Sequence, residues 1–268
     1  MTVDRWAQAV RQQLGIGRLL PLGGPGDGAW ITEAAARGVL RREVAGVRGV
    51  RLGSVRLSGA DPEGAPEAAV PAPPSALPPG PLRIAAQCAA TAEEPLPSAT
   101  GRLRAALARA ADERLGLVVT EVDIQVTALL DADARDGGPE KDERQEPDGA
   151  GADAAAGPAL SGDAERAAQA ALAVPGVARL SGALGRALHI EERQQEPASL
   201  PRRHVRVELA VFAGVRALDV ARAVRRSVTA ALPDAPSVAV LVTAVAAAPA
   251  PAPAPPHAPA APAATPNG

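Results

Sequence analysis

The sequence predicts an α+β protein made of two tandem α-β-β-α-β units, each a small sheet with its helices on one face. Helical and strand patterns alternate along the chain, and they come in the same order in both halves. Pro-, Gly- or acid-rich segments separate the two sets of patterns. Two copies of one unit explain this order, although chance similarity between Ala- and Val-rich segments is the alternative.

The second unit, predicted at residues 161–246, has the clearer patterns. A helix of small residues, Ala164–Ala173, leads into the turn Val174-Pro175-Gly176-Val177. Val205–Phe212 alternates aliphatic and polar residues, as a half-buried strand does. A helix over Ala217–Leu232 and a Val-rich strand over Ser237–Val245 complete the unit.

The first unit is predicted at residues 29–130. Trp30-Ile31-Thr32-Glu33 is expected to open a helix that has Thr32 as its N-cap. A second helix is expected to be capped by Ser98 or Thr100 and to run to Leu115. The expected strands are Arg51–Leu57, Leu82–Ala90 and Val122–Ala128.

Four segments are expected to lie outside these units. Residues 1–28 should form an N-terminal helix, Val3–Leu14, and a flexible Gly-rich connector. The insertion 60–81 has eight prolines and is expected to be an extended loop that joins no core. The linker 131–160 has nine acidic and three basic residues between Asp131 and Asp153, so we expect disorder there and in the Ala/Pro tail 247–268.

Composition excludes several classes of function. The net charge of −2 gives no general reason to bind nucleic acid or an anionic membrane. Cys88 is the only cysteine, which excludes an intrachain disulfide and a cysteine metal cluster, and its apolar surroundings predict a buried, inert thiol. No apolar stretch is long enough to span a bilayer and no signal-peptide core begins the chain. We therefore expect a cytoplasmic protein that does not insert into the membrane.

No pattern predicts a catalytic, cofactor or metal site. The glycines of Gly23–Gly28 resemble a phosphate-binding loop, but no Lys-Ser/Thr pair follows them, which favours a connector. Of the histidines, His257 lies in the tail, His189 fits a surface position, and His204 lies among arginines that disfavour its protonation. We expect no catalytic residues, no cofactor and no metal.

Four arginines define the one candidate interaction surface: Arg216, Arg222, Arg225 and Arg226. Helical spacing puts the last three on one face, opposite a valine stripe that faces the sheet. They form either a solvated polar face or a basic docking surface for an acidic partner, such as the chain's own linker. A regulatory module that binds a small anionic ligand through this face is the alternative function.

The second unit resembles the alkaline-shock-protein (Gls-type) envelope stress response family of Gram-positive bacteria. The resemblance rests on Val174-Pro175-Gly176-Val177 after an Ala-rich helix, on the segment Val211–Ala221 with Val224, Arg225 and Val228 after it, and on a closing Val-x-Val-x-Val strand. Ala213 separates Phe212 from Gly214, where family members have an adjacent aromatic-Gly pair. The acidic strand residues common in the family are reduced to Glu208.

The first unit matches the family more loosely, and the lead-in Gly17–Leu22 is similar to that of actinobacterial relatives sometimes labelled as nucleopolyhedrovirus family proteins. The resemblance implies a non-enzymatic domain for envelope stress response that self-associates as a homo-oligomer. It also implies docking on a membrane-anchored protein partner at the cytoplasmic face. We therefore expect a scaffold or interaction protein.

Overall fold

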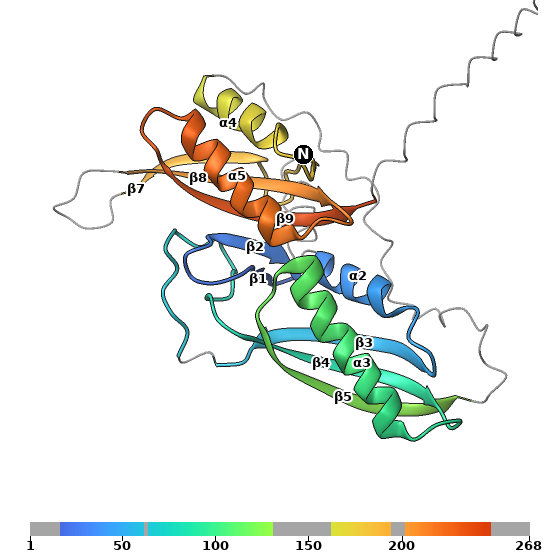
Figure 1. The fold of residues 1–268 in the computed structure, drawn as a ribbon. Coiled ribbons are helices and arrows are strands. Elements are labelled where there is room, and N and C mark those ends of the chain that lie inside the picture. Colours follow the sequence, from blue (N-terminus) through green and yellow to red (C-terminus); the bar gives the residue numbers. More distant parts are fainter. Residues whose placement is uncertain (1–16, 62–63, 131–161, 194–201, 248–268) are drawn as a thin grey trace, which may run out of the picture.

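The protein is an α+β structure with two sheets (Figure 1). The computed structural model describes residues 17–61, 64–130, 162–193 and 202–247. The predicted N-terminal helix, the acidic linker and the tail beyond residue 247 lie outside these ranges. In the described part of the chain, no helix combines the length and apolarity needed to cross a membrane.

The first half forms a three-stranded sheet in the order β3-β4-β5, with β3 antiparallel and β5 parallel to β4. Helices α2 and α3 pack on one face of it, and α3 ends in a short π-helix, η1 (Figure 1). The predicted strands are confirmed and are longer than expected. The elements are α2 (Glu33–Val44), β3 (Val50–Gly59), β4 (Leu82–Thr91), α3 (Leu96–Ala110), η1 (Ala111–Leu115) and β5 (Val119–Leu130).

In the second half, β8 is a central strand that has antiparallel neighbours on one side and a parallel neighbour on the other. β6 and β7 each pair antiparallel with β8, and β9 pairs parallel with it. The pairing directions are those of the first half, but three strands lie between the two helices here and two lie between them there. The origin of the halves as tandem copies stays a prediction. The elements are α4 (Asp163–Leu172), β6 (Val177–Leu180), β7 (Leu188–Arg193), β8 (Arg202–Phe212), α5 (Ala217–Ala231) and β9 (Ser237–Ala246).

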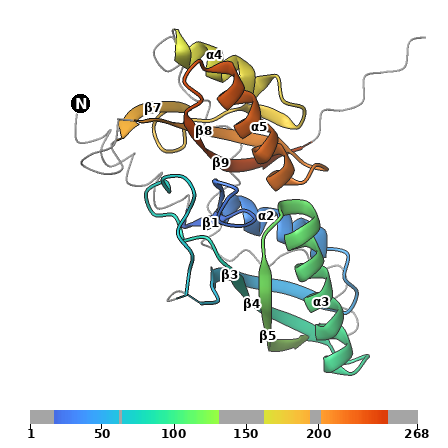
Figure 2. The same cartoon turned by 60° about the vertical axis from the view of Figure 1, so that its left-hand side comes forward.

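A hairpin from the first half extends the sheet of the second half, which the sequence did not predict. β1 (Leu19–Pro21) pairs antiparallel with β2 (Ala29–Thr32), and β2 pairs parallel with β9. The larger sheet therefore has the order β1-β2-β9-β8-β6, with β7 also on β8. Figure 2 shows β8 and β9 above β1. The prediction of a flexible connector was wrong for residues 19–21, and Trp30 and Ile31 are strand residues rather than the start of a helix.

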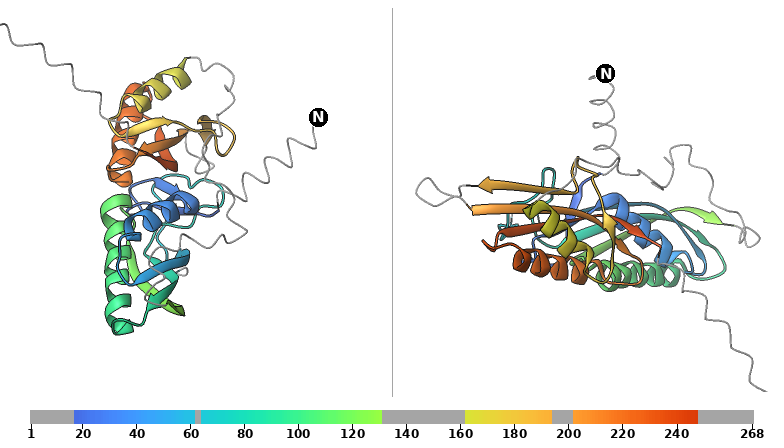
Figure 3. Two further views of the ribbon diagram at one scale, coloured as in Figure 1. Left: turned by 90° about the vertical axis from the view of Figure 1, so that its right-hand side faces the viewer. Right: turned by 90° about the horizontal axis from the view of Figure 1, so that it is seen from above.

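One apolar core joins the two halves. Leu20 and Ile31 of the hairpin, Leu115 of the first half and Leu218 of the second belong to the same buried cluster. The long helices α3 and α5 lie on the same side of the molecule, with the sheets on the other side (Figure 3). The strands thus present their aliphatic residues to one continuous helical layer.

The Pro-rich insertion joins a second, smaller core, contrary to the prediction. Val70 is buried with Leu19, Trp30 and Leu241 on the face of the larger sheet that faces away from the helices. The Leu77 N–H donates to the Leu19 carbonyl at 2.8 Å. The hairpin buries apolar residues on both faces, so the second face needs a cover, and the insertion provides it.

The predicted helix caps had different outcomes. Thr32 is the N-cap of α2, and its hydroxyl oxygen accepts from the Ala35 N–H at 3.2 Å. The cap predicted at Ser98 or Thr100 was wrong, because α3 begins at Leu96 directly after Pro95. Pro97 lies in the first turn of α3, where proline is well suited because it has no N–H to satisfy. Thr100 donates instead to the Leu96 carbonyl at 2.8 Å.

Candidate functional site

The two halves meet at a seam formed by three segments far apart in sequence: the β1–β2 turn, the η1–β5 turn and the start of α5. The Gly23 N–H donates to the Gly116 carbonyl at 2.9 Å, which joins the two turns directly. Gly116 has a φ of +83°, and a Cβ there would lie 2.4 Å from the Leu218 Cβ. Glycine at this position therefore lets α5 approach the first half closely.

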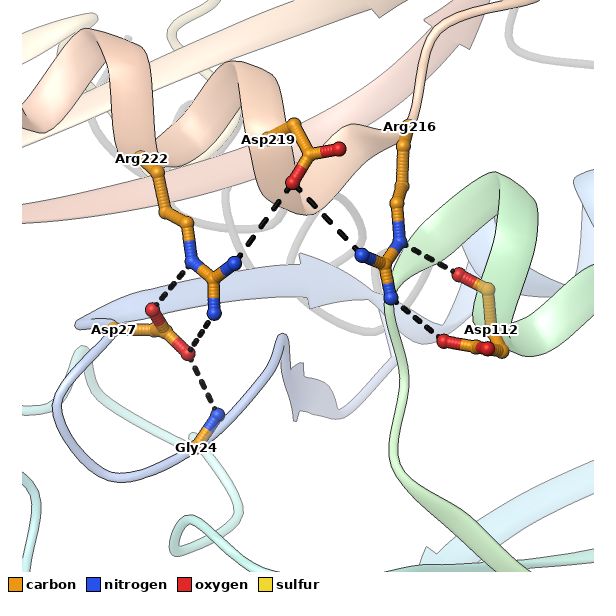
Figure 4. A network of polar contacts seen from close by, with 6 residues as sticks. All are labelled: Gly24, Asp27, Asp112, Arg216, Asp219 and Arg222. Carbon is orange, nitrogen blue, oxygen red and sulfur yellow. Dashed lines mark hydrogen bonds and ion pairs between the residues drawn. The ribbon is translucent and has the colours of Figure 1, made fainter.

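Arg222 binds the β1–β2 turn through a bidentate ion pair with Asp27 (Figure 4). Its Nε lies 2.7 Å from Asp27 Oδ1, and its Nη2 lies 3.0 Å from Oδ2. The same Oδ2 accepts from the Gly24 N–H at 2.7 Å. The hydrogen bond from Arg222 lowers the pKa of the Asp27 carboxyl, against the opposing effect of burial. Asp27 therefore stays ionised and fixes both the turn and α5.

Arg225 joins the same turn to β9, and it does so through backbone carbonyls. Its Nε donates to the Val238 carbonyl at 2.9 Å, and its Nη1 donates to the Gly26 carbonyl at 2.7 Å. Burial lowers the pKa of its guanidinium. Gly28 has a φ of +54°, and a Cβ there would lie 3.1 Å from the Arg225 Cζ. The glycines of the turn thus leave room for this guanidinium, rather than for a phosphate.

Arg216 connects α5 to the end of α3. Its Nη2 lies 2.6 Å from Asp112 Oδ1, and its Nε donates to the Asp112 carbonyl at 2.8 Å (Figure 4). Asp219 lies between the two arginines, with its Oδ1 3.9 Å from Arg216 Nη1 and 3.8 Å from Arg222 Nη1. The seam therefore contains a continuous network of alternating charges.

The four predicted arginines do not form one free surface. Arg216, Arg222 and Arg225 contact the first half, whereas Arg226 lies exposed on α5. Helical spacing placed Arg222 and Arg225 together correctly. The carboxylates that pair with Arg222 and Arg216, those of Asp27 and Asp112, lie about a hundred residues or more away in sequence, so no local pattern could identify them. For these three arginines the acidic partner is in the same chain.

An open groove of about 420 Å³ runs along the seam. Leu117, Val118 and Leu218 give it an apolar part, and Val118 is 46 % exposed. Arg216, Arg222 and Asp112 form its charged rim. The remaining lining residues are Gly23, Gly24, Ala108, Gly116 and Val119.

A second polar cluster lies on the face of the larger sheet that faces away from the helices. His204 is buried, and its Nδ1 lies 2.8 Å from Ser237 Oγ. His189 is on the neighbouring strand, with its Nε2 3.5 Å from Glu191 Oε2. Within the described ranges, no group of three His, Cys, Asp or Glu side chains is placed to hold a metal ion. His257 lies outside those ranges.

Glu208 is fully buried beside this cluster, a position that the sequence did not predict to belong to a site. Its Oε2 accepts from the Leu184 N–H at 2.8 Å, while its Oε1 lies 3.4 Å from Arg206 Nε without a hydrogen bond. Burial raises the pKa of this carboxyl to about 7. A glutamate within an otherwise Val-rich strand was the only sequence signal of this position.

Cys88 is a free thiol and is buried, as predicted. Burial raises the pKa of the thiol, which keeps it in its unreactive protonated form.

Comparisons with protein-family models, curated proteins and solved structures find no match to this chain. The resemblance to the alkaline-shock family thus rests on the sequence motifs alone.

Proposed function

We propose that this chain is a non-enzymatic scaffold for the envelope stress response, and that it binds a polypeptide partner in the seam groove. The resemblance to the alkaline-shock family supports the setting: a cytoplasmic protein recruited to the inner face of the cell membrane by an anchored partner. The groove supports the mode of binding, because it combines one exposed apolar residue, Val118, with a charged rim.

The charge of the groove is the observation that favours a polypeptide over a small anion. Arg216 and Arg222 are matched by three carboxylates, those of Asp27, Asp112 and Asp219. An anion would have to displace Asp27 or Asp112 from its guanidinium and would meet the freed carboxylate there. A polypeptide can instead pack apolar side chains on Val118 and hydrogen-bond to the rim without breaking an ion pair.

Val118→Asp tests this function in the full-length chain. It puts a charge on the apolar part of the groove and should weaken partner binding at least about tenfold, because an apolar contact is replaced by a desolvated carboxylate. Leu172→Asp is the matched control, since Leu172 is similarly exposed, at 50 %, and lies at the end of α4. The measurement is affinity capture from the native cell together with membrane fractionation.

The proposal predicts that the wild type and Leu172→Asp recover one envelope protein and that Val118→Asp loses it. Equal recovery by both variants, or a wild type found without any envelope partner, would contradict it.

The alternative function, a regulatory module for a small anionic ligand, is favoured by one observation: the Arg222 side chain is 42 % exposed at the groove. Thermal shift against nucleotides and phosphorylated metabolites distinguishes the two functions. The scaffold predicts no stabilisation, whereas the alternative predicts stabilisation that Arg222→Ala abolishes, since Arg222 lines the groove.

A further inference from the structure

β5 is the long open edge of the three-stranded sheet. The strand order β3-β4-β5 leaves its outer side without a strand partner among the described residues, and β5 has 12 residues (Figure 1). An open edge presents unpaired backbone N–H and C=O groups and is a template for pairing with another strand.

The other sheet edges are shorter than β5 or are protected. The edge of the larger sheet at β6 and β7 consists of strands of only four and six residues. β3 has a register irregularity between Leu52 and Val55, and Arg41 donates to the Gly53 carbonyl there at 3.4 Å. β1 has only three residues, ends in Pro21 and is bonded by the Pro-rich insertion. From Glu121 to Val126, by contrast, β5 keeps an unbroken register with β4. This regular stretch is the one suited to accept a strand.

The backbone groups of this stretch can be assigned to the edge. Arg104 Nε donates to the Val122 carbonyl at 3.0 Å, which indicates that this carbonyl faces away from β4. Because a strand repeats every two residues, the carbonyls of Ile124 and Val126 face the open edge as well. The guanidinium covers the edge at Val122 and leaves the later positions open.

The outer face of the sheet carries a ladder of polar side chains that stops at this edge. Ser54 Oγ donates to Gln87 Oε1 at 2.8 Å, and Gln87 Nε2 donates to Gln125 Oε1 at 3.3 Å. The ladder therefore uses the amide oxygen of Gln125 and leaves its NH₂ group for an acceptor beyond β5. A second Gln125 would supply that acceptor, because an amide oxygen can accept two hydrogen bonds.

The charge pattern of β5 agrees with antiparallel pairing of two copies centred on Gln125. In that register Asp123 lies opposite Thr127 of the other copy, and Ile124 lies opposite Val126. Pairing centred on Asp123 would instead place two carboxylates directly opposite each other, which is destabilising. Two copies of β5 therefore have compatible side chains in the register centred on Gln125, and repelling carboxylates in the register centred on Asp123.

We propose that two copies of this chain pair through their antiparallel β5 edges about a two-fold axis at Gln125. Their three-stranded sheets then form one continuous six-stranded sheet, and the Ser54–Gln87–Gln125 ladder continues across the axis. The partner is a second copy because the edge is complementary to itself. This interface does not involve the seam groove and is independent of the proposed function.

Charge reversal at the axis tests the pairing with the full-length chain. Gln125→Glu and Gln125→Lys each place two like charges opposite each other, so each variant alone should sediment as a monomer at concentrations where the wild type is a dimer. Mixing the two variants should restore the dimer through a Glu–Lys pair. Arg56→Glu and Arg56→Gln are the controls at an exposed position of the protected β3 edge outside the ladder, and each should leave the dimer intact.

A cysteine at the axis tests the register. Gln125→Cys brings two Cβ atoms to within about 5.5 Å, close enough for a disulfide after small backbone adjustment, so mild oxidation should give a covalent dimer. Asp123→Cys should not cross-link, because its neighbour across the axis is Thr127. A monomeric wild type, charge variants that sediment like the wild type, a mixture that stays monomeric, or a cross-link only through Asp123→Cys would overturn the proposal.

Discussion

Glu208 is a fully buried carboxyl in the middle of β8, and its ionisation opposes folding. Its pKa rises from about 4.5 in the unfolded chain to about 7 in the folded chain because burial penalises the charged form. The stability that the protonated carboxyl supports is therefore fully present below about pH 4.5. It is lost as the pH rises towards about 7, and the free energy of unfolding should fall by about 3 kcal/mol.

Glu208→Gln should remove this pH dependence. Glutamine keeps an oxygen for the Leu184 N–H but has no charge, so the variant should match the wild type in acid and exceed it in stability above about pH 7. Denaturant unfolding over a pH series measures the difference. Glu121→Gln, on the exposed face of β5, is the control, and its stability should not diverge from that of the wild type in this way. Parallel curves for Glu208→Gln and the wild type would show that burial does not shift this carboxyl.

Some residues of the site could be placed from the sequence and others could not. The helical spacing of Arg222 and Arg225 was sufficient to place them on one face of α5, because that relation is local. Their contact with Asp27 depends on how the hairpin packs against α5, which no periodicity encodes. The burial of Glu208 could not be predicted from the sequence either, since it depends on the loop that contains Leu184.

Among the secondary-structure elements, the β1–β2 hairpin was predicted wrongly, as a flexible connector that leads into a helix. Its strands have three and four residues, and such short apolar runs do not show a period of two. Gly-rich composition suggested flexibility, whereas the glycines allow positive φ angles that the tight turn requires. The Pro-rich insertion was assigned wrongly for a related reason, because only the hairpin creates the apolar face that Val70 covers.

The turn of this hairpin should tolerate a side chain at Gly26 and reject one at Gly28. Gly28 has a φ of +54°, and an added Cβ would lie 2.6 Å from Val70 Cγ2 as well as against Arg225. Gly28→Ala should therefore lower the free energy of unfolding by about 1–3 kcal/mol. Gly26→Ala is the control, because a Cβ there meets nothing within 4 Å. Thermal or denaturant unfolding measures both, and equal effects would contradict the role of the turn.

At the scale of the whole molecule, the seam makes the two halves interdependent. The sequence correctly predicted an α+β fold. The predicted order α-β-β-α-β is found from α2 to β5, whereas the second half has a third strand between its helices. The sequence predicted two tandem units joined by an acidic linker and left open whether the units pack on each other. The structure joins them, because β2 of the first half is a strand of the second sheet and the apolar core continues from one half into the other. A pattern read along the chain cannot show a strand added to the other sheet.

Leu218→Ala should therefore destabilise both halves together. Leu218 belongs to α5 but lies against Gly116 of the first half, and it is 3 % exposed within the shared core. Removing its buried methyl groups should cost about 2–4 kcal/mol of unfolding free energy. If the halves unfold as one body, native-state hydrogen exchange should show the same loss of protection in β4 and in β8. Loss confined to β8, with β4 unchanged, would instead mean that the halves fold independently and that the seam only holds them side by side.

Leu129→Ala, at the 64 % exposed end of β5, is the control and should leave both strands protected.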